Sequence, residues 1–243
     1  MTILKHIDFE VPDWGELAQG PQTRLAYRDE VMADNPIRYW RLGEPSGITA
    51  VDETGNGNGQ YKNNPTLGAA GLLTLDPDTA VQFGSFSVMD SGTVLVKTDD
   101  GGAQAYTFEC WFKSSASSNT SLMGQFKAND GNRWLLRLTT GGAIQYRLGG
   151  TAMLLAPGPF NDGVSHHLAV IKAFGLISMW IDGVFKTDTD NLHVFSDANF
   201  VVGATRTAGT GSFDGVIDEA AVYESFLSSS RITAHFDVGT AAV

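Results

Sequence analysis

Two adjacent carboxylates, Asp218 and Glu219, interrupt the otherwise apolar segment SFDGVIDEAAVYE, which spans residues 212–224. The alternation in this segment predicts a long strand, on which neighbouring side chains point to opposite faces of a sheet. Carboxylates buried in such a strand need a cation, a metal ion or backbone donors as partners. Because the two side chains face apart, we expect each to have its own partner, and we do not expect a catalytic pair.

The loop DETGNGNG, residues 52–59, carries a second set of oxygen atoms. Its glycines let backbone carbonyls turn inward. It also offers four polar side chains on alternating positions: Asp52, Thr54, Asn56 and Asn58. Calcium takes about six to eight such oxygen ligands. The glutamate that closes an EF-hand is missing, which excludes a regular EF-hand. The loop is therefore either part of a calcium site or a polar turn whose amides hydrogen-bond Asp218 directly.

Paired acids for glycoside hydrolysis are not evident. That chemistry needs two carboxyl groups about 5–9.5 Å apart. The predicted strand FECWFK contributes only Glu109. Asp214 and Asp218 share a face of their strand, yet they lie roughly 13 Å apart at about 3.3 Å per residue. The sequence also lacks the G-x-S-x-G pattern of serine hydrolases. We therefore expect a protein that is not an enzyme.

The histidines and the cysteine favour structural roles. His166 and His167 are neighbours on a predicted strand, so they point to opposite faces and do not chelate one metal ion. Cys110 is the only cysteine, which excludes a disulfide within the chain. It lies between aromatic residues, as a small core side chain would.

Carbohydrate binding would use aromatic faces together with polar groups. Four residues on predicted central strands are candidates: Trp134, Tyr146, Arg147 and Trp180. Polar loops at 128–132 and 205–211 could line the rim of such a site. The alternative is that the tryptophans belong to the core of a sandwich, where large aromatic side chains are common.

The elements that must position these residues are mostly strands. Short apolar segments separated by glycine-rich turns predict an all-β fold, a two-sheet antiparallel jelly-roll sandwich. We expect strands at 37–42, 79–83, 93–98, 106–114, 120–127, 133–139, 143–149, 166–174, 176–182, 184–187, 199–204 and 212–224. Asp182-Gly183 predicts a type I′ hairpin turn. Two short helices are expected, at 23–34 and at 228–236 with Ser228 as the N-cap. We expect the chain to consist of two parts: an N-terminal arm and helix, residues 1–36, and the sandwich domain, residues 37–243.

Charge and hydropathy narrow the function classes. The net charge of −11 argues against nucleic-acid binding, because no basic patch offers phosphate contacts. No stretch approaches the roughly 18–20 apolar residues of a membrane span, so membrane insertion is not expected. Residues 1–14 carry charge and lack an apolar run, so no signal peptide is predicted. These features favour a protein made in the cytoplasm, and assembly into a virus particle is one route by which it could leave.

Several motifs occur together in one order. They are YWRLGE (39–44), D-x-x-G-N-G (52–57), TAVQF (79–83), YTFECWFK (106–113), HHLAV (166–170), WIDG (180–183) and FDGVIDEAAVY (213–223). With them the chain resembles the laminin G-like, concanavalin A-like jelly-roll domains of the bacterial and phage type. Ser165 departs from the family, which usually has tryptophan before the two histidines. The segment 27–44 is similar to the lead-in of phage virion proteins that carry such domains.

The resemblance implies the following expectations. A structural calcium ion would be held by Asp52, Asn56 and Asp218. The protein would be a non-enzymatic virion component, a capsid decoration or tail protein that displays a lectin-like jelly roll and attaches to host-surface glycans. It would form homo-oligomers and contact other virion proteins through its N-terminal arm. The alternatives are a carbohydrate-binding adhesion module of a bacterial surface protein and a glycan-degrading enzyme.

Overall fold

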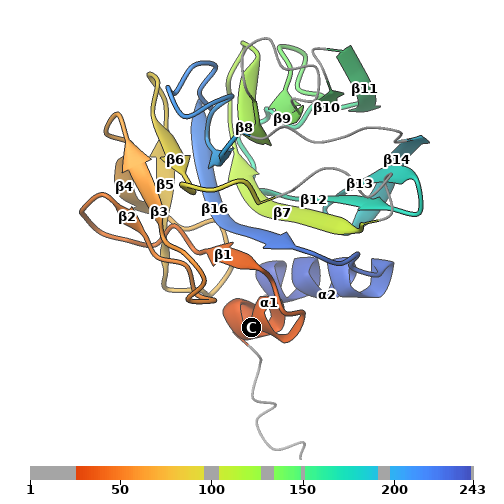
Figure 1. The fold of residues 1–243 in the computed structure, drawn as a ribbon, viewed down its shortest axis with the longest axis horizontal. Coiled ribbons are helices and arrows are strands. Elements are labelled where there is room, and N and C mark those ends of the chain that lie inside the picture. The colour runs from red at the N-terminus through yellow and green to blue at the C-terminus, as the bar shows by residue number, and fades with distance from the viewer. Residues whose placement is uncertain (1–25, 96–103, 127–133, 149–150, 191–197, 242–243) are drawn as a thin grey trace, which may run out of the picture.

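The fold is a three-layered arrangement of two β-sheets and a pair of helices (Figure 1). The structure, a computed structural model, describes residues 26–95, 104–126, 134–148, 151–190 and 198–241. Within these residues all strand pairs are antiparallel, and the strands form two sheets of eight strands each. This confirms the predicted two-sheet antiparallel sandwich.

Sheet A is built around the central strands β7 and β16. Its order is β14-β13-β12-β7-β16-β5-β4, and β1 pairs with part of β16. Its strands are β1 (Arg38–Trp40), β4 (Thr66–Ala70), β5 (Thr79–Phe83), β7 (Tyr106–Lys113), β12 (His166–Ala173), β13 (Leu176–Ile181), β14 (Val184–Asp190) and β16 (Gly215–Tyr223).

Sheet B faces sheet A across the main core. Its order is β11-β10-β9-β8-β15-β6-β3-β2. Its strands are β2 (Thr49–Ala50), β3 (Gly59–Lys62), β6 (Val88–Asp90), β8 (Thr120–Gln125), β9 (Trp134–Leu138), β10 (Ile144–Leu148), β11 (Thr151–Ala156) and β15 (Phe200–Val202). In β10 the buried residues Ile144, Tyr146 and Leu148 alternate with the half-buried Gln145 and Arg147, as the sequence predicts.

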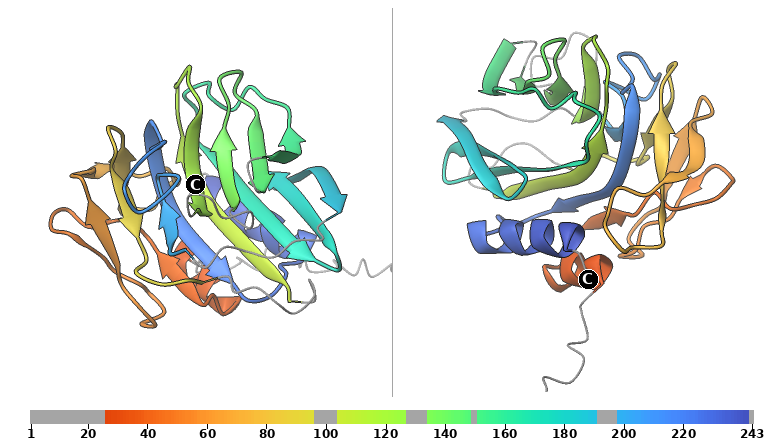
Figure 2. Two further views of the ribbon diagram at one scale, coloured as in Figure 1. Left: turned by 45° about the horizontal axis from the view of Figure 1, so that its top comes forward. Right: turned by 180° about the vertical axis from the view of Figure 1, so that it is seen from behind.

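The two helices form a third layer on the outer face of sheet A. They are α1 (Tyr27–Ala33) and α2 (Ser229–Thr240), and Figure 2 shows them against the same sheet from two further directions. Tyr27 and Val31 of α1 and Ile232 of α2 share a buried apolar cluster with Trp111 and Ile171 of the sheet. Because this cluster covers one face and sheet B covers the other, β7 and β12 are buried along nearly their whole length. Ser228 caps α2 by accepting a hydrogen bond from the backbone N–H of Arg231, as predicted.

The structure corrects several element predictions. Residues 93–95 form no strand and 96–98 lie outside the described residues, whereas β6 lies just before them, at Val88–Asp90. The turn at Asp182 and Gly183 is confirmed, since both have positive φ angles of 54° and 70°. Besides β6, four strands were not predicted from the sequence: β2, β3, β4 and β11. In β4 the exposed residues outnumber the half-buried ones, so it lacks the apolar signal of a core strand.

Two of the predicted carbohydrate-binding residues lie in the core. Trp134 is 0% exposed and Tyr146 is 1% exposed, and both belong to the cluster between the sheets. Their rings lie 6.1 Å apart, stacked on one another. A ring enclosed on all sides offers no face to a sugar, so the expectation that these two residues form a binding platform is wrong. The alternative reading, that they are core aromatics, is the one the structure supports.

Candidate functional site

The paired acids of β16 have separate partners. Glu219 interrupts the pairing of β16 with β7, and its φ of 54° turns the backbone outward in a bulge. Its carboxylate accepts hydrogen bonds from Nη2 of Arg41 at 2.8 Å, from Nε of Arg41 at 3.0 Å and from the hydroxyl of Tyr39. Burial raises the pKa of Glu219 to about 7, against the opposing effect of the Arg41 charge. The carboxylate of Glu219 therefore links β16 to β1 and to the residue that follows β1, through hydrogen bonds to Tyr39 and Arg41.

Asp218 lies on the other side of the strand, against a different loop. Its Oδ2 accepts a hydrogen bond of 2.9 Å from the backbone N–H of Leu72. The side chain is almost fully buried, and burial together with Glu219 raises its pKa well above the usual value. Asp218 therefore meets a backbone donor, one of the three partners that the sequence analysis considered.

The loop at 52–59 closes on itself. The carboxylate of Asp52 accepts hydrogen bonds from the backbone N–H groups of Tyr39, Thr54 and Gly57, at 2.9, 3.1 and 2.9 Å. Asn56 donates its amide N–H to the carbonyl of Ile37 at 3.2 Å. In the described part of the chain, Asp218 accepts its hydrogen bond from Leu72 and not from this loop, and no three His, Cys, Asp or Glu residues are grouped as a metal site. Calcium at this loop stays a prediction.

A buried ionic cluster holds the helices to sheet A. Glu109 is 0% exposed and accepts hydrogen bonds from the hydroxyl of Tyr27 at 2.7 Å and from Nδ1 of His235 at 2.9 Å. Nε2 of His167 lies 3.1 Å from the same carboxylate. Although burial opposes ionisation, His235 and His167 hold the pKa of Glu109 well below its usual range. We interpret the cluster as a structural one, since its acid is closed off from solvent.

His166, the neighbour of His167 on β12, lies on the opposite face of this strand, as the sequence predicts. Its Nδ1 lies 2.8 Å from Oδ2 of Asp182, and its Nε2 lies 3.2 Å from Oδ1 of Asp162. These carboxylates raise its pKa, although burial acts against them. Both histidines therefore have a carboxylate neighbour within the fold, which agrees with the structural roles that the sequence favours.

The predicted carbohydrate-binding residues do not gather on one surface. Arg147 lies on the outer face of sheet B, where it is half-buried. Trp180 lies on the outer face of sheet A, packed at the edge of the helical cluster and 5.5 Å from the ring of Phe185. With Trp134 and Tyr146 in the core between them, the four residues do not form one site.

A polar hollow lies instead at one end of the sandwich, among the loops that follow β5, β7 and β15. We call it the loop-end cleft; its volume is about 380 Å³, and it is lined by Gly84, Ser85, Phe86, Ser118, Asn119, Thr120, Gly211, Ser212 and Asp214. A second hollow of about 290 Å³, which includes Lys113 and Gln82, shares Asp214 with it. The predicted rim loop 205–211 therefore contributes its last residue, while the other predicted rim loop, 128–132, lies outside the described residues.

Phe86 is held in an exposed position at this cleft. Its side chain is 63% exposed. Its backbone φ of 72° lies in the left-handed region, which residues other than glycine rarely adopt. Two hydrogen bonds fix the backbone of Phe86. The hydroxyl of Ser212 accepts one from the Phe86 N–H at 3.0 Å, and the side-chain amide of Asn63 donates one to the Phe86 carbonyl at 2.8 Å. A Cβ at Gly209 would collide with that carbonyl, so only glycine allows this close approach. An uncommon backbone geometry that presents an aromatic ring to solvent points to a function for that ring.

Sequence reasoning missed Phe86. The short segment GSFS reads as an ordinary turn, and nothing in it signals that the phenylalanine points outward. Only the contacts from Asn63, Gly209 and Ser212, which are distant in sequence, fix its orientation.

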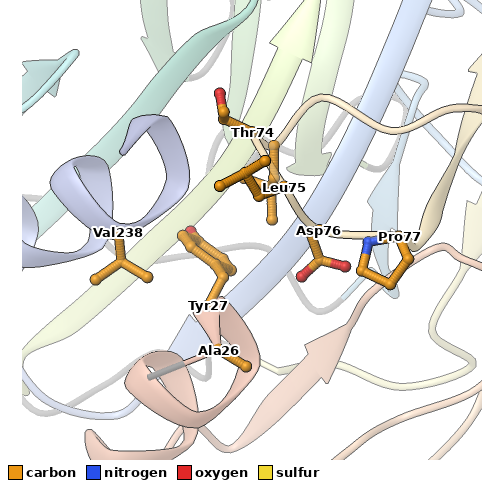
Figure 3. A pocket seen from close by; sticks show the side chains of 8 residues that line it. Ala26, Tyr27, Thr74, Leu75, Asp76, Pro77 and Val238 are labelled. Carbon is orange, nitrogen blue, oxygen red and sulfur yellow. The ribbon is translucent and has the colours of Figure 1, made fainter. Parts of the chain in front are cut away.

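A further hollow, of about 280 Å³, lies at the helical layer (Figure 3). Its lining is largely apolar and comes from the start of α1, the end of α2 and the loop before β5: Ala26, Tyr27, Leu73, Thr74, Leu75, Asp76, Pro77 and Val238. It has none of the clustered serine and asparagine side chains of the loop-end cleft, and we do not assign it a ligand. Among the described residues, no helix has the length and apolar character that crossing a membrane requires.

The fold and the cleft define a lectin-like jelly-roll domain. A sequence model described as the Concanavalin A-like lectin/glucanases superfamily, of laminin G type, matches residues 89–233, which is more than half of the chain. The chain therefore belongs to this superfamily, as its motifs predict. A search of curated proteins finds no match.

Solved structures with the same fold include binding domains from larger proteins. The binding domain of botulinum neurotoxin serotype D aligns with 86% of this chain and 52% of its own length, at 13% identity and a TM-score of 0.59. The binding domain of Paraclostridial Mosquitocidal Protein 1 aligns with 84% of this chain and 52% of its own, at 11% identity and a TM-score of 0.62. The chain thus spans about half the length of these toxin domains.

Domain 4 of AbnA, a GH43 extracellular arabinanase from Geobacillus stearothermophilus solved in complex with arabinotriose, is matched over nearly its whole length. It aligns with 84% of this chain and 98% of its own, at 21% identity and a TM-score of 0.59. At these identities the likeness establishes the fold alone.

Proposed function

We propose that the protein is a non-enzymatic, glycan-binding jelly-roll domain that holds its ligand in the loop-end cleft. The observation that carries the proposal is the exposed ring of Phe86, fixed by its backbone beside a polar hollow. A sugar offers an apolar ring face together with hydroxyl groups, so a binding site combines an aromatic face with hydrogen-bonding side chains. Asn119, Ser212 and Asp214 supply such groups around Phe86.

Two observations support this assignment. The superfamily to which the chain belongs is named for lectins and glucanases, and the arabinanase domain with the same fold is described in complex with arabinotriose. The acids Glu109, Asp218 and Glu219 are buried and engaged within the protein, which favours binding over hydrolysis.

The test is a binding measurement on the variant Phe86→Ala. We expect the wild-type protein to bind bacterial surface polysaccharides on a glycan array, and the variant to bind the same ligands roughly tenfold more weakly, the size of a typical loss at an aromatic hot spot. The matched control is Phe174→Ala, which removes another exposed phenylalanine at a positive φ of 54°. Phe174 follows the end of β12 that pairs with Tyr106, whereas the cleft is lined by Ser118 and Asn119, which follow the other end of β7.

The control variant should bind like the wild type. Equal binding by the Phe86→Ala and Phe174→Ala proteins, or a wild type that binds no glycan, would refute the proposed site.

We further propose that the domain is carried on a phage particle, as a capsid decoration or tail-associated protein and as a homo-oligomer. The support is the lead-in segment 27–44, which resembles that of phage virion proteins. The predicted docking arm, within 1–36, falls mostly outside the described residues. Immunogold labelling of purified particles tests this; particles without label would contradict it.

Calcium at Asp52, Asn56 and Asp218 also remains a proposal. The support is the oxygen-rich loop at 52–59. Added calcium should then raise the melting temperature of the wild type, and Asp52→Asn should lower the size of that rise. Melting that is insensitive to both calcium and chelator would reject it.

A further inference from the structure

The loop-end cleft and the second hollow beside it are two parts of one groove. Both have Asp214 in their lining. The same three chain segments also line both hollows: the end of β5 with the residues that follow it, the connection from β7 to β8, and the segment that leads into β16. Because each segment passes from one hollow into the other, the two hollows are continuous. We call them together the extended groove.

Three strands of sheet A contribute a row of side chains to the second hollow. Val216 of β16 pairs with Gln82 of β5 on one side and with Lys113 of β7 on the other. The residue next to each of them along its strand belongs to the main core: Ile217, Val81 and Phe112. Successive side chains of a strand point to opposite faces, so the row faces outward. Lys113 is exposed, so the helical layer leaves this end of the sheet open.

The junction between the two hollows is held in place before any ligand arrives. The buried hydroxyl of Ser114 donates a hydrogen bond to the carbonyl of Asp214 at 2.6 Å and accepts one from the N–H of Ala116 at 3.0 Å. A Cβ at Gly215 would lie 2.3 Å from the carbonyl oxygen of Lys113, so glycine allows the segment before β16 to lie directly on β7. A preformed groove binds with a smaller loss of conformational freedom than a groove that must be ordered.

The lining of the extended groove carries one acid and one base, Asp214 and Lys113. Both residues are exposed, and among the described residues neither side chain takes part in an ion pair or a side-chain hydrogen bond. A ligand therefore reaches them without first breaking an internal contact. The carboxylate accepts hydrogen bonds and the ammonium group donates them, and sugar hydroxyl groups can do both. Because the two charges cancel, the lining favours a ligand that is uncharged and rich in hydroxyl groups.

We infer that the extended groove binds a linear, uncharged glycan along several consecutive sugar units. One unit packs on Phe86 in the loop-end cleft, the chain passes Asp214, and a later unit reaches Gln82 and Lys113 on sheet A. The volumes of the two hollows, about 380 and 290 Å³, each lie near the lower end of the range of about 300–1,000 Å³ for ligand pockets. Each hollow therefore suits a small part of a chain. The inference rests on the proposed function and adds a second subsite to it.

The experiment compares a disaccharide with a hexasaccharide, both cut from the neutral polysaccharide that gives the strongest signal on the glycan array. The wild type should bind the hexasaccharide roughly tenfold or more tightly, because only the longer chain reaches both subsites. The double variant Gln82→Ala/Lys113→Ala should lose about this factor for the hexasaccharide and change less than about twofold for the disaccharide. Phe86→Ala should weaken the binding of both.

Two further variants serve as controls. Lys186→Ala removes an exposed lysine from β14, which lies three strands away from β7 in sheet A, and it should leave both affinities unchanged. Lys113→Gln keeps a hydrogen-bond donor and loses the charge. Because an uncharged ligand needs the donor more than the charge, this variant should lose less hexasaccharide affinity than Lys113→Ala.

The outcomes separate this inference from the proposed function. Equal affinities for the two fragments, with a double variant that matches the wild type, would overturn the inference and leave the Phe86 site intact. Binding to acidic polysaccharides alone would also overturn it. A wild type that binds no glycan would refute the proposed function, and the second subsite with it.

A measurement on the wild type tests the second subsite without any substitution. The side-chain amide NMR signals of Gln82 should shift when the hexasaccharide is added and stay in place with the disaccharide. Unshifted signals at saturating hexasaccharide would show that the chain does not reach this row.

Discussion

Glu219 shows how one residue can stabilise a fold and also make it sensitive to pH. Its carboxylate lies at a bulge in β16, where Arg41 and Tyr39 reach it from the chain segment that contains β1. Arg41 also lies 2.9 Å from Asp76 and 3.2 Å from Asp78, so one cation is shared among three carboxylates. That shortage of positive charge, added to burial, keeps the Glu219 proton more tightly bound than in the unfolded chain.

We expect a pH dependence of stability from this residue. A carboxyl group whose folded pKa is about 7, above an unfolded value near 4.5, binds more protons in the folded state between those values. The free energy of unfolding should therefore fall as pH rises from about 4.5 to 7. Chemical denaturation at pH 5 and pH 7 tests this. Glu219→Gln should show a smaller fall than the wild type; an equal fall in both would show that other groups are responsible.

Residue roles could be predicted from sequence only where the local pattern decides them. The alternation in 143–149 identified correctly which residues of β10 face the core, including Tyr146, yet its aromatic ring was also considered as a binding face. A tryptophan or tyrosine has the same sequence signal in a core as on a platform. Phe86 and the row formed by Gln82, Val216 and Lys113 depend on loop contacts and strand register, which no local pattern encodes.

At the scale of elements, the helical layer is part of the folded domain. Tyr27 and Val31 are buried against sheet A, and Arg231 of α2 contacts Glu30 and Asp34 at 2.6 and 2.9 Å. The sequence suggested a boundary at residue 36, because Pro36 ends a helical pattern. It could not show that the helix packs on strands that lie far along the chain.

Truncation should separate the helix from the residues that precede it. Deletion of 1–25 keeps the described contacts of α1 with sheet A and α2, so we expect the melting temperature of this variant to stay within a few degrees of the wild type. Deletion of 1–35 removes Tyr27 and Val31, each of which contributes about 1.5–3 kcal/mol when buried, and also a hydrogen-bond partner of Glu109. It should lower stability by several kcal/mol, as measured by urea denaturation. Equal stability of the two truncated proteins would show that the helical layer is dispensable.

This result also decides how particle association should be tested. A deletion through residue 35 that abolished association could do so by destabilising the sandwich. The shorter deletion, 1–25, tests the proposed docking arm without that complication.

At the scale of the whole molecule, the elements were easier to predict than their partners. Central strands such as β7 and β12 were found because apolar residues fill both of their faces. Strands β3 and β4 were missed because their few apolar residues meet only one layer, between glycine and asparagine turns. The outer surface of sheet A is largely covered by the helices, which leaves the outer surface of sheet B and the loop ends for ligands.

The direction of β16 has a practical consequence for experiments on this protein. Its first residue, Gly215, lines the hollow beside the cleft, and the chain runs through nine residues, about 30 Å at 3.3 Å each, to Tyr223 and on to α2. Ala26 and Val238 line one common hollow at the helical layer, on the outer face of sheet A (Figure 3). A tether joined directly at Ala26, in a protein without residues 1–25, or after Ala241 therefore starts from the helical side of the molecule, so a sensor chip that holds the protein by such a tether should leave Phe86 facing the solution.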